Sequence, residues 1–313
     1  MENRARNIAI AIVLAAALLV PLWLWMRPQP EGRQTHSIVP TVSATSGDAS
    51  VAVDRSLMTV MELQLKSFSA HYPEARVSLS PEPSGRTVLR LLDREAGGAV
   101  VDGALIREED SVVATLKRPL RREPIARNAL VFIVNRDNPV RSVSIPDLRK
   151  LFSGRLNDWQ ALGGRPGPIT VCIDGGDFRS RAVLSSALFG KSMHISAAAT
   201  RDVAQLLSRV AEDPRAAAIV TLPQYAAAIR AGSAGRIMAL PVSREEGTVA
   251  VEASPATLYS GDYPLVSIVY YLYNPFDRTA TGFGAWLGKE GQKLFERGDM
   301  APYRQTVRTI ILK

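Results

Sequence analysis

From Val51 to the end of the chain, short runs of β-branched and other apolar residues alternate with amphipathic stretches of helical period. This alternation predicts an α/β fold, because strands that are each followed by a covering helix assemble into a largely parallel sheet. The chain has 313 residues, of which 46% are hydrophobic and 22% charged. That length and balance allow two globular lobes, each with a core of its own.

Polar residues stand at three places where a predicted strand runs directly into a predicted helix. The junctions are Asp54-Arg55-Ser56 after strand 51–53, Pro83-Ser84-Gly85-Arg86 after strand 77–79, and the run 174–180 after strand 169–173. In open α/β sheets, ligands collect beyond the carboxyl ends of strands, where helix N-termini present free N–H groups. The junctions therefore indicate an anion cleft, although Ser56, Ser84 and Ser180 are each also explained as plain N-caps. None of the three carries a P-loop or a dinucleotide fingerprint.

An apolar segment, Ile8 to Met26, precedes this region. At about 1.5 Å per helical residue, its roughly 19 residues span about 28 Å, close to the thickness of a bilayer core. The segment ends in bulky residues that include Trp23 and Trp25, whereas a secretory signal peptide ends in small residues before its cleavage site. We therefore predict an uncleaved anchor over 1–27 with its N-terminus inside, a cleaved signal peptide being the alternative. A linker rich in Pro, Ser and Thr follows over 28–49.

The net charge, the single cysteine and the three histidines exclude several classes of function. The net charge of +8 suits an anionic ligand or membrane surface, but no Lys/Arg block interleaved with aromatics indicates nucleic-acid binding. The single cysteine, Cys172, lies in an apolar run and is expected to be a buried strand thiol. His36, His71 and His194 have no second ligand at metal spacing, so we predict no metal and no cofactor. Without a nucleophile elbow or an ordered triad, we do not expect an enzyme.

Other conspicuous residues have structural interpretations. Trp159 and Trp286 stand in amphipathic surroundings that favour the core. The adjacent carboxylates at 108–109 and 245–246 point apart in either regular structure, and we expect them on solvated faces.

Several motifs in the second half of the chain occur in a specific order. Segment 123–140 (EPIARNALVFIVNRDNPV) is followed by 144–159 (SIPDLRKLFSGRLNDW) and by 162–169 (LGGRPGPI). Later come Tyr263-Pro264-Leu265 before an apolar strand, and FGAWL at 283–287 with EGQKL at 290–294. In this order they resemble the phosphate-binding proteins of ABC importers, over roughly residues 50–313.

The resemblance implies a two-lobed periplasmic binding fold of type II. Lobe 1 would comprise 50–125 plus 222–313, and lobe 2 would comprise 126–221. An oxyanion would be held in the cleft by N–H and hydroxyl donors from the three junctions, since charge-assisted hydrogen bonds are strong.

Individual ligand-binding residues follow from the same resemblance. Ser56 and Leu57 match the first anion loop, and Ser84 and Gly85 match the Ser-Gly of the second. Asp102 lies near the family's carboxylate that accepts a proton from phosphate, but a solvated or helix-capping aspartate explains it equally well.

The third loop departs from the family pattern, which is an Arg followed by a Ser-Gly-Thr run. Here Ile173 and Asp174 occupy the Arg region, and the run 177–181 (DFRSR) replaces Ser-Gly-Thr. Like charges beside a dianion are costly, so Asp177 is not expected to face one. Arg179 or Arg181 could supply a cation beside Ser180, but residues two apart on a helix face different ways, so at most one reaches the cleft. We therefore expect Arg179 and Ser180 to complete the site.

The sequence thus predicts an extracytoplasmic solute-binding protein that captures phosphate or a similar oxyanion for an ABC permease. The alternative is a membrane-anchored sensory or assembly module with the same fold and a different or lost ligand. The uncleaved anchor favours this alternative slightly, because transport receptors are usually released or lipid-tethered.

Overall fold

The structure is a computed structural model that describes residues 43–117, 119–175, 178–190, 193–232 and 235–304. The predicted anchor and most of the predicted linker lie outside these residues. Within the described ranges, no helix combines the length and the apolar character needed to cross a bilayer. The described residues between Ser43 and Arg304 belong to one compact unit.

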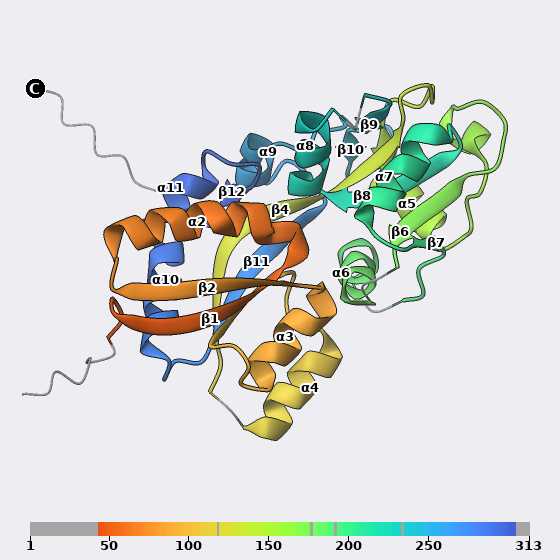
Figure 1. Cartoon of the computed structure of the whole chain (residues 1–313). Helices are drawn as coiled ribbons and strands as arrows, with labels where there is room; N and C mark the ends of the chain where they lie inside the picture. The colour runs from red at the N-terminus through yellow and green to blue at the C-terminus, as the bar shows by residue number, and fades with distance from the viewer. Residues whose placement is uncertain (1–42, 118, 176–177, 191–192, 233–234, 305–313) are drawn as a thin grey trace, which may run out of the picture. The chain divides into compact units, whose positions relative to one another are not determined.

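Strands and helices alternate along this unit, as the sequence predicts (Figure 1). The strands are β1 (Gly47–Asp54), β2 (Ala75–Glu82), β3 (Gly98–Asp102), β4 (Arg121–Asn135), β5 (Val143–Ser144), β6 (Thr170–Asp174), β7 (Ala198–Thr200), β8 (Ala216–Thr221), β9 (Ile237–Ala239), β10 (Val242–Ser243), β11 (Val266–Tyr273) and β12 (Ala301–Pro302). The helices are α2 (Met58–His71), α3 (Ser84–Leu92), α4 (Arg107–Leu116), α5 (Ile145–Phe152), α6 (Phe178–Phe189), α7 (Val203–Glu212), α8 (Leu222–Arg230), α9 (Pro255–Ser260), α10 (Arg278–Gly288) and α11 (Gln292–Phe295), with 3₁₀ turns η1 (Arg55–Leu57) and η2 (Trp159–Leu162).

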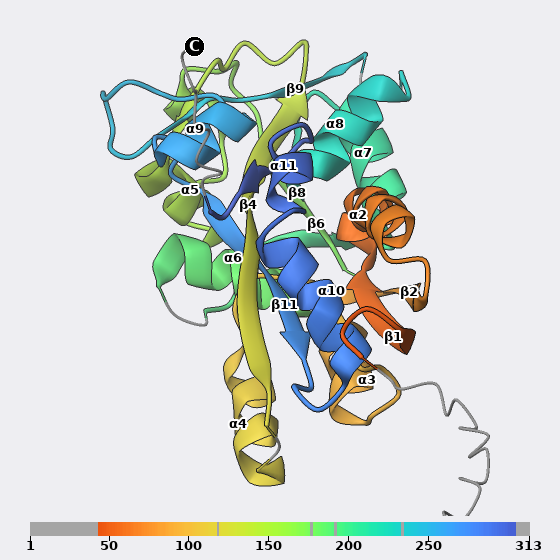
Figure 2. The same cartoon turned by 90° about the vertical axis from the view of Figure 1, so that its left-hand side faces the viewer.

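The long strand β4 joins two halves of the main sheet. The strand order is β2-β1-β3-β11-β4-β8-β6-β7, and β9 and β12 also pair with β4. The first part of β4 pairs antiparallel with β11, and its part from Leu130 to Val134 pairs antiparallel with β8. Both views show β4 running beside β11 (Figures 1 and 2). Its residues 128–135 are all buried, as expected for a strand covered on both faces.

In the first half of the sheet, successive β3 residues face opposite layers. Val100 packs in a core with α2, α10 and α11, whereas Val101 packs in a smaller core under α3 and α4. Trp286 is 4% exposed in the larger of these cores, with its ring edge-on to Phe68. β1 pairs parallel with both β2 and β3, and β4 and β11 also contribute side chains to these cores.

The second half of the sheet has a separate core around β4, β6 and β8. Trp159 is 3% exposed there, and Cys172 of β6 is 2% exposed. The core interpretation of both tryptophans and the buried-thiol interpretation of Cys172 are therefore confirmed. Apolar residues from the segment 222–265 also pack into this core, among them Leu222 and Tyr263.

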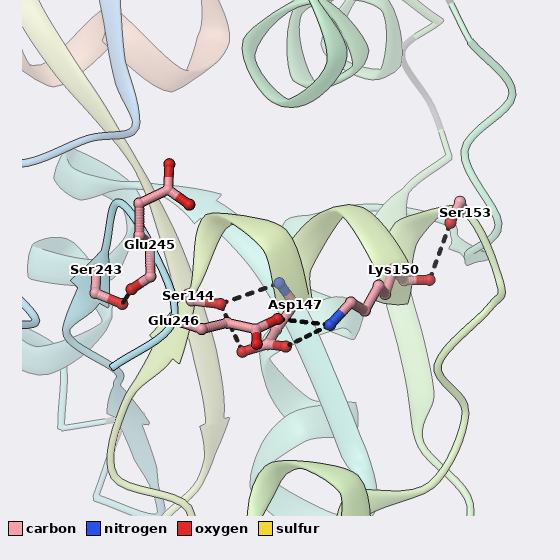
Figure 3. Close-up of polar contacts among 7 residues, drawn as sticks. All are labelled: Ser144, Asp147, Lys150, Ser153, Ser243, Glu245 and Glu246. Atoms are coloured by element: carbon pink, nitrogen blue, oxygen red, sulfur yellow. Dashed lines mark hydrogen bonds and ion pairs between the residues drawn. The ribbon is translucent and has the colours of Figure 1, made fainter. Parts of the chain in front are cut away.

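A polar cluster on the surface of this half ties α5 to the short pair β5–β10 (Figure 3). Ser144 caps α5 by accepting from the Asp147 backbone N–H at 3.1 Å, and Pro146 stands in the first turn. Lys150 Nζ lies 2.6 Å from Glu246 Oε1, and this hydrogen bond raises the pKa of the lysine. The Lys150–Glu246 pair is exposed and stabilises the local geometry only modestly.

One prediction about the carboxylates is wrong. Glu109 is 6% exposed rather than solvated, and its Oε2 accepts a hydrogen bond from the Ile106 backbone N–H at 3.0 Å. The side chain reaches back over the first turn of α4, where it satisfies a donor that the helix itself leaves open. Glu245 and Glu246 are exposed, as predicted.

Candidate functional site

A cavity of about 560 Å³ opens where strands of both halves of the sheet end. Asp54, Asp102, Asp174 and Thr221 are the last residues of β1, β3, β6 and β8, and all four line it. Residues of η1, α2, α3, α6, α7 and α8 also contribute to the described lining. The cavity therefore lies at the place where open α/β sheets bind ligands.

The first junction brings Ser56 into the cavity but not Leu57. Ser56 lies in η1 and lines the cavity, whereas Leu57 is fully buried in the core of the first half. The residue pair predicted from the sequence is thus divided between the cavity and the core, because consecutive residues of a helical turn point in different directions.

The second junction places Ser84 as the first residue of α3, 7% exposed and in the cavity lining. Gly85 follows it in the first helical turn and is not among the described lining residues. Pro83 precedes them with an extended backbone and caps α3 without a side-chain hydrogen bond. The plain N-cap interpretation therefore does not describe Ser84.

Asp54, the first residue of the first junction, is a cavity residue that sequence reasoning did not include in the binding site. It is 3% exposed, and its Oδ1 accepts from the Ser56 backbone N–H at 2.9 Å and from Ser56 Oγ at 2.7 Å. Ser84 Oγ donates to its other oxygen, Oδ2. A sequence signal existed, because an aspartate at the end of an apolar strand and before a helical turn is a strong capping candidate. Its contact with Ser84 is not visible in the sequence.

Asp102 lies at the end of β3 and is 7% exposed. Its Oδ2 accepts from Asn128 Nδ2 at 2.8 Å, and Asn128 is fully buried on β4. The solvated alternative is thus wrong, and the N-cap of α4 is Ile106 rather than Asp102. The contact ties the cavity wall to the strand that joins the two halves.

The third junction contributes Ile173, Asp174 and Ser180 to the cavity lining. Asp177 and the side chain of Arg179 lie outside the described residues. Arg181 is described, is half-buried and is not among the lining residues.

Charged residues from further along the chain also line the cavity, and they were not predicted from the sequence. Arg230 and Asp299 form a two-point ion pair at 3.0 and 2.8 Å, which raises the pKa of the arginine. Asp202 caps α7 by accepting from the Gln205 backbone N–H at 2.8 Å, and this bond and the bond from Arg201 lower the pKa of Asp202.

Carboxylates outnumber arginines around the cavity. The described lining holds five aspartates (Asp54, Asp102, Asp174, Asp202 and Asp299) and three arginines (Arg55, Arg201 and Arg230). Neutral donors, chiefly serine hydroxyls and backbone N–H groups, must therefore do most of the binding of any anion that enters here. Within the described residues, no group of three or more His, Cys, Asp or Glu side chains could hold a metal ion.

A two-lobed α/β binding fold with its cavity at the strand ends defines a class of ligand-binding proteins rather than enzymes. The PBP superfamily domain matches residues 39–290, most of the chain. The chain belongs to this superfamily.

Relatives of known sequence are distant. Over 129 residues, 41% of this chain, the sequence is 25% identical to phosphate-binding protein PstS 2 of Streptococcus pneumoniae, in both the TIGR4 and R6 strains. The match spans 42% of the length of those relatives.

Solved structures share the fold over almost their whole length. A putative phosphate ABC transporter substrate-binding protein with bound phosphate from Clostridium perfringens superposes with a TM-score of 0.67 at 16% identity, covering 82% of this chain and 100% of that one. An ABC-type phosphate transport receptor from Vibrio cholerae gives 0.62 at 17% identity, covering 81% and 99%. The regulatory domain of MetR, a LysR family regulator from N. meningitidis, gives a TM-score of 0.51 at 12% identity, covering 82% of this chain and 99% of that one.

Proposed function

We propose that this protein is an extracytoplasmic solute-binding protein that captures phosphate or a similar oxyanion and delivers it to an ABC permease. The observation that carries the proposal is the strand-end cavity, which Ser56 and Ser84 line from one half of the sheet and Ser180 from the other. The superfamily and the similarity to phosphate receptors support it. Binding needs no cofactor, because hydroxyl and N–H donors suffice for an oxyanion.

The lobe boundaries remain part of this proposal. The resemblance divides the chain into 50–125 plus 222–313 and 126–221, with β4 among the connections between the lobes. Since apolar residues of 222–265 pack into the core of the second half, part of that segment would move with lobe 2 if the lobes close on a ligand.

We also propose that residues 1–27 form a single-pass anchor in the cytoplasmic membrane, with the binding unit on the outer side. The proposal rests on the apolar run 8–26 and its aromatic end. The full-length chain is then expected in the membrane fraction after carbonate washing. A soluble protein whose N-terminal sequence begins near residue 40 would instead indicate a cleaved signal peptide.

The second candidate is an anchored sensory or assembly module with a different or lost ligand. The hydrogen bonds that Asp54 receives in the cavity, and the excess of carboxylates around it, favour this candidate. The fold similarity to the MetR regulatory domain shows that the fold also occurs outside transport receptors.

Calorimetric titration of the full-length, detergent-solubilised protein with inorganic phosphate distinguishes the two candidates. The Streptococcus pneumoniae relative serves as the reference in the same buffer. We expect saturable binding about 10- to 100-fold weaker than that of the reference, because one lost charge-assisted contact costs about 1.5–3 kcal/mol. Absence of binding to phosphate and to sulfate would remove oxyanion capture and leave the second candidate.

Two arginine variants test the third loop in the same titration. Arg179→Ala should weaken phosphate binding by about tenfold or more if Arg179 supplies the cation that the family places elsewhere. Arg181→Ala is the matched control, because Arg181 does not line the described cavity. Equal effects of the two variants would contradict a direct role for Arg179.

A further inference from the structure

Three hydrogen-bond donors of the cavity converge on one carboxylate of the protein itself. The Ser56 backbone N–H, the Ser56 hydroxyl and the Ser84 hydroxyl all donate to Asp54, which is 3% exposed. Two of these donors belong to one junction and the third to another, 30 residues along the chain. The convergence has the form of a small anion site, and the anion in it is the Asp54 side chain.

Helix capping accounts for only part of this arrangement. One bond from the Ser56 backbone N–H to Oδ1 is enough to cap η1. The Ser84 hydroxyl comes from the start of a different helix, α3, whose N-cap is Pro83, so its bond to Oδ2 caps nothing. The bond from Ser84 Oγ to Oδ2 therefore links two junctions of the cavity through the Asp54 carboxylate.

The two serines cannot serve an external anion while they serve Asp54. A serine hydroxyl carries one proton and donates one hydrogen bond at a time. An oxyanion that entered beside Ser56 and Ser84 would also meet the carboxylate that these donors now stabilise, and like charges in a poorly solvated site repel strongly. Binding would require these donors to turn from Asp54 to the ligand.

We propose that Asp54 is a specificity-determining residue of this cavity, an internal carboxylate that holds the oxyanion donors and so limits the affinity for phosphate-type ligands. This inference rests on the proposed function in one respect, namely that the cavity is where an oxyanion binds. It adds a second cause of weak binding, separate from the altered third loop.

The test compares phosphate affinities of full-length variants by calorimetry, with sulfate as a second probe. Asp54→Asn keeps an amide oxygen that can still accept from the Ser56 N–H, but it removes the charge and frees the hydroxyls. Asp54→Ser is a second neutral variant that retains a capping side chain. Each should bind phosphate about tenfold or more tightly than the natural chain, the gain of one charge-assisted bond and the loss of one repelling charge.

Asp202→Asn is the matched control. Asp202 is also a cavity-lining aspartate that caps a helix, but its partners are Gln205 and Arg201 rather than the junction serines. We expect it to change phosphate affinity by no more than about threefold. A gain equal to that of Asp54→Asn would overturn the inference, since it would reflect general charge removal.

The remaining outcomes separate this inference from the proposed function. If the natural chain binds phosphate and neither Asp54 variant binds it more tightly, although circular dichroism shows both folded, the inference is wrong and the proposed function stands. If only the variants bind, the inference holds and oxyanion capture by the natural chain is excluded. If neither the natural chain nor the folded variants bind phosphate or sulfate, both fail.

Discussion

Replacing Ser84 with Asp would place a second carboxylate against Asp54 in a poorly solvated site. From the sequence alone, this change is expected to abolish oxyanion binding and leave the fold intact. The structure predicts a different result, because Ser84 is 7% exposed and Asp54 is 3% exposed, and the side chains touch. We expect Ser84→Asp to destabilise the folded protein as well.

Two ways of estimating the loss of stability in Ser84→Asp give a similar value. Two charges about 4 Å apart at an effective dielectric of about 20 repel by about 4 kcal/mol. Alternatively, one carboxyl group takes up a proton, which at pH 7 costs about 1.36 × (7 − 3.9), or about 4 kcal/mol, and at pH 5 about 1.5 kcal/mol. Folding of the variant then binds a proton, so its stability should recover as the pH falls from 7 to 5.

Urea unfolding at pH 7 and pH 5 measures this difference, with the fluorescence of the buried Trp159 and Trp286 reporting on both cores. The control is Ser84→Asn, which has the same shape without the charge. The aspartate variant should be less stable than the asparagine variant by about 3–4 kcal/mol at pH 7 and by about 1–2 kcal/mol at pH 5. Equal stabilities at pH 7, or a difference that persists unchanged at pH 5, would refute the placement of Ser84 on Asp54.

Two further predictions concern the cores. Gln64→Leu should lower the free energy of unfolding by about 2–4 kcal/mol, because it removes the hydrogen-bond partner of two buried groups. These groups are Trp286 Nε1, which donates to Gln64 at 3.1 Å, and the Gly291 carbonyl oxygen, which accepts from Gln64 at 2.9 Å. The exposed control on the same helix, Leu63→Ala, should change the free energy of unfolding by less than about 0.5 kcal/mol in the same urea titration. Burial raises the pKa of the Tyr263 hydroxyl, so as the pH rises the unfolded chain loses this proton before the folded chain does. The free energy of unfolding should therefore fall by up to about 1.4 kcal/mol per pH unit above about pH 10, and Tyr263→Phe should reduce this slope. A slope that the variant leaves unchanged in urea titrations from pH 9 to 11 would contradict this.

The α/β architecture and its strand-to-helix junctions could be predicted because they depend on local pattern. Apolar runs of strand length and apolar residues at helical spacing are read directly from neighbouring residues, and so are caps such as Ser144. The core positions of Trp159, Trp286 and Cys172 followed from the same patterns. The family was recognisable from ordered motifs, and the superfamily match over 39–290 agrees with it.

Only the tertiary structure decided which groups the junction residues contact. Parallel pairing of β1 with β2 sets Asp54 opposite Glu82, and this register brings Ser84, two residues further on, to the Asp54 carboxylate. No local pattern encodes a register between strands that are more than twenty residues apart, because it depends on how both strands pack against a common core. The sequence by itself therefore indicated three of the loops that border the cavity, whereas the fold decided that the hydroxyls of Ser56 and Ser84 donate hydrogen bonds to Asp54, a carboxylate of the chain itself.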